Sequence, residues 1–181
     1  MSRIVVSQPL PDYLRPELEL VFVGINPGLK SAETGHHYAG PGNLFWPLLF
    51  ESGLVSEPLT YEQDARVLQW SIGLTNMVHR ASRSVSDLSR DELKAGAEEL
   101  RGKLVEYGPR LVCFNGKGIY EVFVGHAARL GPQQERIGES LAFVMPSTSA
   151  RTAAYQRADK LRFFEELYRL VREPGGAEEV A

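Results

Sequence analysis

Apolar and polar positions along the chain repeat with two different periods, which separate short strands from amphipathic helices. Compact apolar runs bounded by turn residues cover residues 18–23, 72–75, 110–114 and 141–145, and each predicts a buried strand. Apolar positions three or four residues apart predict helices over 43–53, from 60 toward 70, from 89 through 104, from 116 through 124 and over 161–171. Capping-box sequences at 60–63 and 89–92 mark two of the helix starts.

Strands that alternate with helices predict an α/β fold, in which a short central parallel sheet lies between two layers of helices. We expect one domain over residues 17–172, preceded by an irregular, proline-rich lead-in (1–16) and followed by a flexible tail without periodicity (173–181). Ligands of such sheets bind beyond the carboxyl ends of the strands. The loops after Val23, Thr75, Phe114 and Met145 are therefore the places to look for chemistry.

Composition narrows the class of protein. The 181 residues, 43% hydrophobic and 24% charged, suit one globular domain. No apolar run reaches the length of a membrane span, and the start is too polar for a signal peptide. We expect a protein of the cytoplasm, associated with the nucleoid, if the source is bacterial, or of the nucleus if it is eukaryotic.

The cysteine and histidine content predicts no metal site and no cofactor. Cys113 is the single cysteine, and the four histidines lack the spacing of paired ligands. The dinucleotide fingerprint GxGxxG is missing, so we expect no nucleotide cofactor. The net charge of −3 argues against a nucleic-acid partner, although it leaves room for local cations that touch a few phosphates.

Several loops contain residue sets that are unusual for simple connectors. They read GINPG at 24–28, GHHYAGPGNLFW at 35–46, TNMV at 75–78, FNGK at 114–117 and MPSTSAR at 145–151. In this order the motifs resemble those of the mismatch-specific uracil and thymine DNA glycosylases, within the uracil-DNA glycosylase superfamily, over about residues 17–172. The resemblance implies a uracil-DNA glycosylase-like fold. It also implies a monofunctional hydrolase that flips uracil, with thymine left open, out of a mismatch with guanine. The product would be an abasic site for base excision repair.

Asn26 is the expected catalytic residue. The resemblance implies that it positions the water that attacks the sugar C1′. A neutral amide orients water but is a poor base, so we expect slow turnover. The two glycines of 24–28 would let the backbone approach the ligand, with Gly24 and Ile25 against the base. The alternative is that Asn26 only shapes the turn.

The pocket for the flipped base is expected in the segment after this turn. By resemblance, Tyr38 stacks on the base, although ordinary core packing is the alternative. His37 matches the thymine-accepting branch of the family, and Ser31 matches the uracil-preferring branch. Asn76 could contact the base edge, and backbone N–H groups of 35–42 could stabilise the departing base as an anion. Asn43 is expected to cap the helix that follows.

Residues 147–151 are expected to face the DNA. By resemblance, Ala150 and Arg151 fill the gap left by the flipped base and face the opposing guanine, with Ser147 near the base and Ser149 near the DNA. A solvated arginine is the alternative. Lys117 follows a strand-to-helix turn and could bind a phosphate. His79, Arg80 and Arg83 either touch the DNA backbone or lie in a solvated loop.

The expected partner is double-stranded DNA with a G·U or G·T mismatch, bound by a monomer. Lys30 and Lys117 are the lysines within the motif loops, so a Schiff-base lyase activity has no support. A catalytically weak protein that binds mismatches or abasic sites on the same fold is the alternative function.

Overall fold

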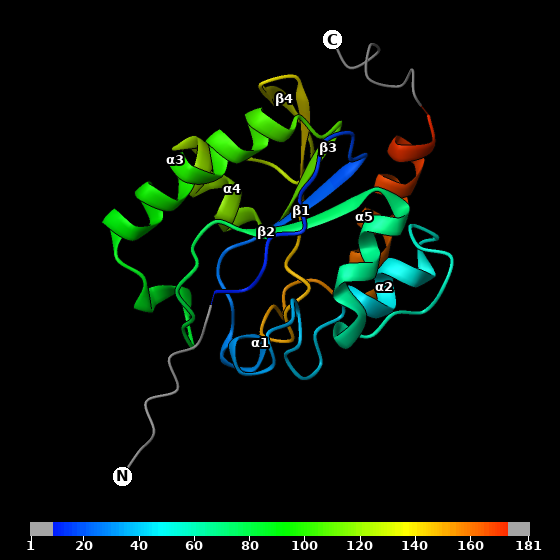
Figure 1. Cartoon of the computed structure of the whole chain (residues 1–181), viewed down its shortest axis with the longest axis horizontal. Helices are drawn as coiled ribbons and strands as arrows, with labels where there is room; N and C mark the ends of the chain where they lie inside the picture. The colour runs from blue at the N-terminus through cyan, green and yellow to red at the C-terminus, as the bar shows by residue number, and fades with distance from the viewer. Residues whose placement is uncertain (1–8, 174–181) are drawn as a thin grey trace.

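A five-stranded sheet runs through the centre of the molecule in the order β2-β1-β3-β5-β4 (Figure 1). The strands are β1 (Leu20–Gly24), β2 (Ile72–Asn76), β3 (Leu111–Asn115), β4 (Gly131–Ile137) and β5 (Ser140–Met145). Strand β1 pairs in parallel with β2 and with β3, and β3 pairs in parallel with β5. Strand β4 pairs antiparallel with β5. The structure, a computed structural model, describes residues 9–173.

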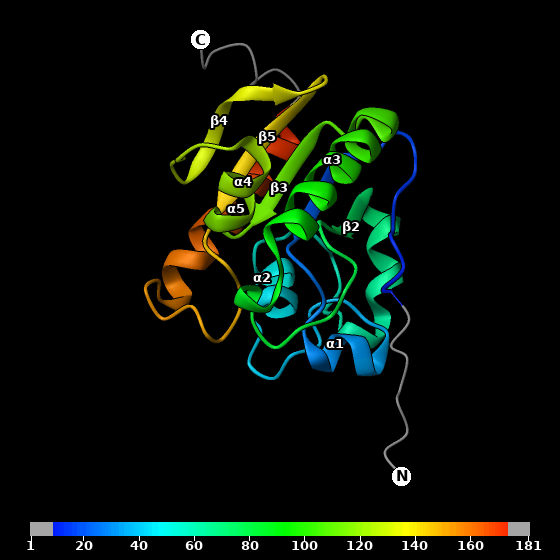
Figure 2. The same cartoon turned by 90° about the vertical axis from the view of Figure 1, so that its left-hand side faces the viewer.

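Helices cover both faces of the sheet (Figures 1 and 2). They are α1 (Leu29–Thr34), α2 (Phe45–Glu51), α3 (Arg90–Tyr107), α4 (Lys117–Val124) and α5 (Arg157–Arg172), with 3₁₀ segments η1 (Tyr61–Trp70) and η2 (Val85–Asp87). Side chains of α2, α5 and η1 share one core with the sheet, and those of α3 and α4 share the other. The predicted three-layer α/β/α fold is confirmed.

The apolar runs predicted as strands are buried on both sides, as expected for parallel strands between helices. In β1, Leu20 and Phe22 pack toward the α2 and α5 layer, and Val21 and Val23 pack toward α3 and α4. All four side chains are fully buried. Burial on both faces explains why these strands show continuous hydrophobicity instead of alternation.

One strand and one α-helix escaped the sequence patterns, and the sheet is not wholly parallel. Strand β4 lies at the edge, where most of its side chains are exposed, so its sequence GPQQERI carries no apolar run. Helix α1 is short and mostly polar, and its segment was expected to be a loop. Both elements are too solvent-exposed to leave a hydrophobic signature.

The predicted helix starts have the expected polar contacts. Thr60 and Ser89 each form a capping box with the residue three positions later. Asn43 lies one residue before Leu44, the N-cap of α2. Its Oδ1 accepts a hydrogen bond from the Phe45 amide at 3.0 Å. Assigned helix boundaries commonly differ by a residue, so the capping role holds in substance.

The predicted lead-in and tail fall partly outside the described residues, namely 1–8 and 174–181. Residues 9–16 contain no helix or extended strand, yet they pack on the domain. Tyr13 forms an isolated bridge with Leu74: its amide donates to the Leu74 carbonyl at 2.9 Å and its carbonyl accepts from Leu74 at 3.1 Å. This contact places the lead-in beside the middle of β2.

Candidate active site

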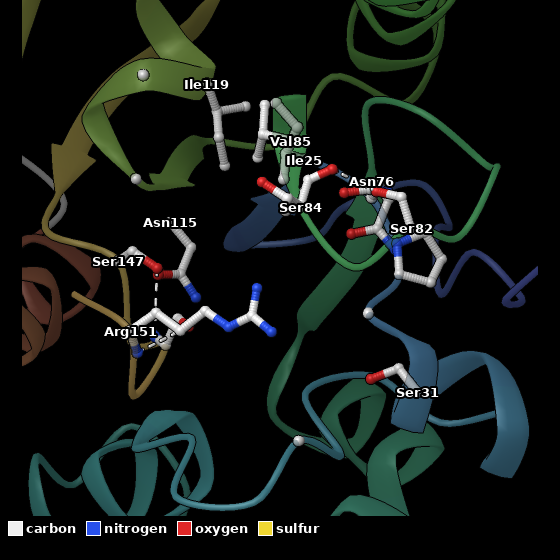
Figure 3. A pocket seen from close by; sticks show the side chains of 18 of the residues that line it. Ile25, Ser31, Asn76, Ser82, Ser84, Val85, Asn115, Ile119, Ser147 and Arg151 are labelled. Carbon is white, nitrogen blue, oxygen red and sulfur yellow. Dashed lines mark hydrogen bonds between the residues drawn. The ribbon is translucent and has the colours of Figure 1, made fainter. Parts of the chain in front are cut away.

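An open cavity of about 1470 Å³ lies at the carboxyl ends of the parallel strands (Figure 3). Its wall brings together almost all of the residues predicted for the site: Gly24, Ile25, Asn26, Ser31, His37, Tyr38, Asn76, Ser147, Ser149, Ala150 and Arg151. Lys117 does not line the cavity; its side chain is half exposed and its Nζ lies 3.6 Å from Glu121 Oε1. The geometry therefore joins the residues predicted to bind the base and those predicted to face the DNA in one cavity, and leaves Lys117 on the outer surface beside it.

Gly24 ends β1 where two polar side chains, those of Asn76 and Tyr38, converge. A Cβ at this position would lie 2.3 Å from Asn76 Oδ1 and 3.5 Å from the Tyr38 hydroxyl. Contacts within the protein thus require a glycine at this position, and the approach of the turn backbone to a ligand stays a prediction. At Gly28 an added Cβ would meet open space, so protein contacts do not require a glycine there.

The amide of Asn26 has a fixed orientation. Its Nδ2 donates two hydrogen bonds, to the Arg80 carbonyl and to Ser82 Oγ, both at 2.8 Å. Because a carbonyl can only accept, the nitrogen cannot exchange places with Oδ1. With both protons of the nitrogen engaged, the carbonyl oxygen of the side chain is the group left to accept a hydrogen bond at the cavity wall.

Ser82 is a site residue that the sequence did not reveal. It lies in a serine-rich loop that reads as solvated, yet it is buried and lines the cavity. Its hydroxyl donates to the Ser84 carbonyl at 2.7 Å, which leaves its lone pairs to accept from Asn26. The loop and the Asn26 turn are also joined through the Ser82 amide, which donates to the Pro27 carbonyl at 3.2 Å.

Tyr38 packs in the core, one of the two roles weighed for it from the sequence, while its stacking on a flipped base stays a prediction. Its ring stacks on Phe45 with centroids 4.1 Å apart and planes inclined by 23°, and it also lines the cavity. Its backbone adopts φ = 53°, a left-handed conformation that is uncommon outside glycine and asparagine. Burial raises the pKa of its phenol, so the ring stays neutral.

His37 is a buried, neutral part of the wall. Its Nε2 donates to the Pro11 carbonyl at 2.7 Å, which places the ring proton on Nε2. Burial lowers the pKa of His37 below its usual range. The His37 carbonyl accepts from Trp46 Nε1 at 3.1 Å, so the residue is fixed through both its side chain and its backbone.

A buried carboxylate anchors this wall from beneath. Asp64, from η1, is 1% exposed. It accepts from the His37 amide at 2.9 Å, from the Tyr13 hydroxyl at 3.0 Å and from His36 Nδ1 at 3.0 Å. Nothing in the sequence pattern singled out Asp64, because an acidic residue in the first turn of a helix is usually a solvated one.

Part of the 35–42 segment cannot serve the ligand, although its backbone was expected to offer N–H donors. The amides of Gly35 and His36 donate to the Ser31 carbonyl, and the amide of Ala39 donates to Ser31 Oγ at 3.1 Å. With the His37 amide also engaged by Asp64, the amide of Tyr38 and those of 40 and 42 are the donors left in this segment. Ser31 therefore shapes the loop through hydrogen bonds as well as lining the cavity.

The loop after β5 forms the opposite wall (Figure 3). The Asn115 side chain and Thr148 clasp each other twice: Nδ2 donates to Thr148 Oγ1, and the Thr148 amide donates to Oδ1, both at 2.9 Å. The Leu44 amide donates to the Thr148 carbonyl at 3.0 Å. These contacts fix the base of the loop, and Ser147 Oγ accepts from the Ser149 amide at 3.2 Å at the start of its tip.

Arg151 reaches across the mouth of the cavity. Its Nη1 donates to the Arg83 carbonyl at 2.6 Å, and both residues line the cavity. The neighbouring cations are committed elsewhere, since Arg80 pairs with Glu92 at 2.6 Å and His79 Nε2 lies 2.9 Å from Glu99. Of the three loop residues considered for the DNA backbone, Arg83 is the one placed at the cavity.

No helix among residues 9–173 is long and apolar enough to cross a bilayer.

A solved structure with this fold is the solution NMR structure of a candidate uracil DNA glycosylase from Methanosarcina acetivorans. It aligns with a TM-score of 0.61 and 24% identity, over 90% of this chain and 98% of that one. Residues 11–172 match the family described as the uracil DNA glycosylase superfamily. The match covers all of the helices and strands and every residue that lines the cavity except Leu10. The chain therefore belongs to the uracil DNA glycosylase superfamily.

Proposed function

We propose that the chain is a monofunctional DNA glycosylase that acts on uracil, and more slowly on thymine, mispaired with guanine. Membership of the superfamily supports a hydrolytic DNA glycosylase. The observation that carries the proposal is the fixed amide of Asn26, whose oxygen remains as an acceptor at the wall of the cavity. An acceptor in that place holds an attacking water by one of its protons.

The reaction is the hydrolysis of the N-glycosidic bond. The water oxygen forms a bond with C1′, and the bond from C1′ to N1 of the base breaks, with its electron pair leaving on the base. One proton of the water is released to solvent. Because Asn26 is neutral, it orients the water without removing this proton, which suits a transition state in which the sugar already carries positive charge. We expect a slow enzyme for this reason.

Recognition of the base is proposed to come from the two walls around Asn26. Tyr38, supported from behind by Phe45, offers one ring face to an extruded base. Asn76 presents an amide against Gly24 at the end of the sheet, and an amide can pair with both donors and acceptors of a pyrimidine. His37, neutral at physiological pH, fills the wall without adding charge. A neutral, closely packed wall of this kind suits an uncharged base.

The duplex is proposed to meet the loop after β5. Ala150 and Arg151 would enter the space of the flipped base, with Arg151 releasing the Arg83 carbonyl to face the opposing guanine. Ser149 and Lys117 would contact the backbone from either side of the site. This assignment predicts that substitution of Arg151 changes the discrimination between mismatches more than it changes the rate of the chemical step.

The test is a single-turnover cleavage assay on labelled duplexes with U·G, T·G and U·A pairs and on single-stranded uracil DNA, with alkali added to reveal abasic sites. We expect cleavage in the order U·G, then T·G, strand breaks only after alkali, and no adduct trapped by borohydride. A trapped adduct would identify a lyase and point to Lys30, which lines the cavity beside Glu33 at 3.4 Å.

The same experiment distinguishes a glycosylase from the alternative function, a catalytically weak protein that binds mismatches or abasic sites. That candidate draws support from the absence of a carboxylate or imidazole bonded to Asn26 among residues 9–173. It predicts tight binding of the U·G duplex with no base released over a long incubation. Release of uracil in a single turnover would exclude it.

A further inference from the structure

Lys160 is a lysine buried within the protein without a carboxylate partner. It projects from the first turns of α5 and is 4% exposed. None of the ion pairs within residues 9–173 includes it. Its ammonium instead donates to two backbone carbonyls, that of Thr152 at 3.2 Å and that of Ser149 at 3.4 Å. Burying a charge that only backbone carbonyls solvate costs folding free energy, so we expect Lys160 to have a role in the site.

The two carbonyls belong to the first and last residues of one turn. The Thr152 amide donates to the Ser149 carbonyl at 3.1 Å, which closes a β-turn over residues 149–152. Ala150 and Arg151 occupy the two central positions of this turn. The residues proposed to enter the DNA thus sit at the tip of a turn whose two ends are joined by the Lys160 ammonium.

Other contacts of this loop act at its base or at its exposed face. The clasp between Asn115 and Thr148 lies before the turn begins. Within the turn, the Arg151 amide donates to Ser149 Oγ at 3.3 Å, and the Arg151 guanidinium reaches the Arg83 carbonyl at the surface. Lys160 is the side chain of α5 that ties the turn to the helical layer behind it.

We propose that Lys160 is a positioning residue that holds the 149–152 turn in the shape required to enter the duplex and stabilise the extruded nucleotide. The inference rests on the proposed function of the site. A turn ordered in advance does not lose conformational entropy when it enters DNA, so its preorganisation favours the flipped state. Lys160 touches neither the base nor the sugar, and its effect is limited to the step in which the base leaves the stack.

The test compares Lys160→Met with the wild type on two substrates. One duplex carries U·G, and in the other uracil faces an abasic analogue, so that no base pair has to be broken. We expect about tenfold slower single-turnover cleavage of U·G at subsaturating protein, because both hydrogen bonds of the ammonium to the turn are lost, and a change of less than about twofold on the second duplex. A 2-aminopurine beside the uracil should show less extrusion. Lys160→Arg, which keeps the donors, should recover part of the loss.

Arg110→Met is the matched control. Arg110 is also a cation that donates to two backbone carbonyls of α5, those of Leu170 and Val171 at 2.7 and 2.9 Å, but it lies at the other end of the helix and also pairs with Glu19 at 2.7 Å. Its substitution should lower the melting temperature without altering the ratio of the two cleavage rates. Equal slowing of both substrates by Lys160→Met, or the same rate ratio in both variants, would overturn the inference. A wild type that releases no uracil would refute the proposed function instead, and the 2-aminopurine signal would still decide the role of Lys160.

Discussion

The hydrogen bonds of Asn26 allow a quantitative prediction for Ser82. The hydroxyl of Ser82 is one of two acceptors that fix the Asn26 amide, and Ser82→Ala removes it while leaving the Arg80 carbonyl in place. A neutral hydrogen bond contributes about 0.5–1.5 kcal/mol. If that energy is lost from the reactive orientation, the chemical step slows about two- to tenfold. Asn26→Ala removes the positioned oxygen itself and should slow the step about a hundredfold or more.

The decisive measurement is a double-mutant cycle under single-turnover conditions with saturating protein on a U·G duplex. Because Ser82 acts through Asn26, Ser82→Ala should have no further effect in the Asn26→Ala background. Ser84→Ala is the control, since its hydroxyl accepts from Ser86 at 3.3 Å and makes no contact with Asn26. Additive effects of the two substitutions, or an equal loss in Ser84→Ala, would refute the reasoning.

Three further predictions concern the walls of the cavity. Gly24→Ala places a Cβ 2.3 Å from Asn76 Oδ1. The rate of uracil release should therefore fall at least about tenfold, and the free energy of unfolding should fall by about 1–3 kcal/mol. Asn76→Ala in the Gly24→Ala background should restore the melting temperature but not the activity. Burial lowers the pKa of His37 in the folded protein, so the unfolded chain binds the extra proton. The free energy of unfolding should therefore be highest above about pH 6.5 and fall as the pH drops below it, a slope that urea titrations should find reduced in His37→Asn. Arg151→Ala should reduce the preference for U·G over U·A in cleavage assays, and an unchanged preference would contradict its place opposite the guanine.

The core of this fold was predictable because burial leaves a periodic signal. The four parallel strands are short apolar runs, and the long helix α3 carries both its capping box and its apolar stripe in the sequence. Strand β4 was missed for the opposite reason, since an exposed edge strand has no apolar run to detect. Its antiparallel direction depends on a tight connection to β5 that a pattern of hydrophobicity does not encode.

The site divides along a similar line. Residues in sequence motifs, such as Asn26 and Tyr38, were predicted at the cavity and line it. Ser82 and Asp64 act through hydrogen bonds to residues far away in the sequence, and Lys160 acts on a turn in the loop that precedes its helix. Each of the three occupies a position that looks solvated when only its neighbours in the sequence are considered. Such groups emerge only when tertiary structure supplies their partners.

The charge distribution of the cavity resolves the main argument against a DNA partner. The net charge of −3 averages over the whole chain. Acids near the site are drawn into ion pairs, as in Glu92 with Arg80. The cavity wall carries the cations Lys30, Arg83, Arg90 and Arg151, against Glu121 as its one carboxylate among the described residues. Phosphates respond to the local field within about a Debye length rather than to the total charge. A protein that is acidic overall can therefore present a basic mouth to DNA and keep a neutral interior for the base.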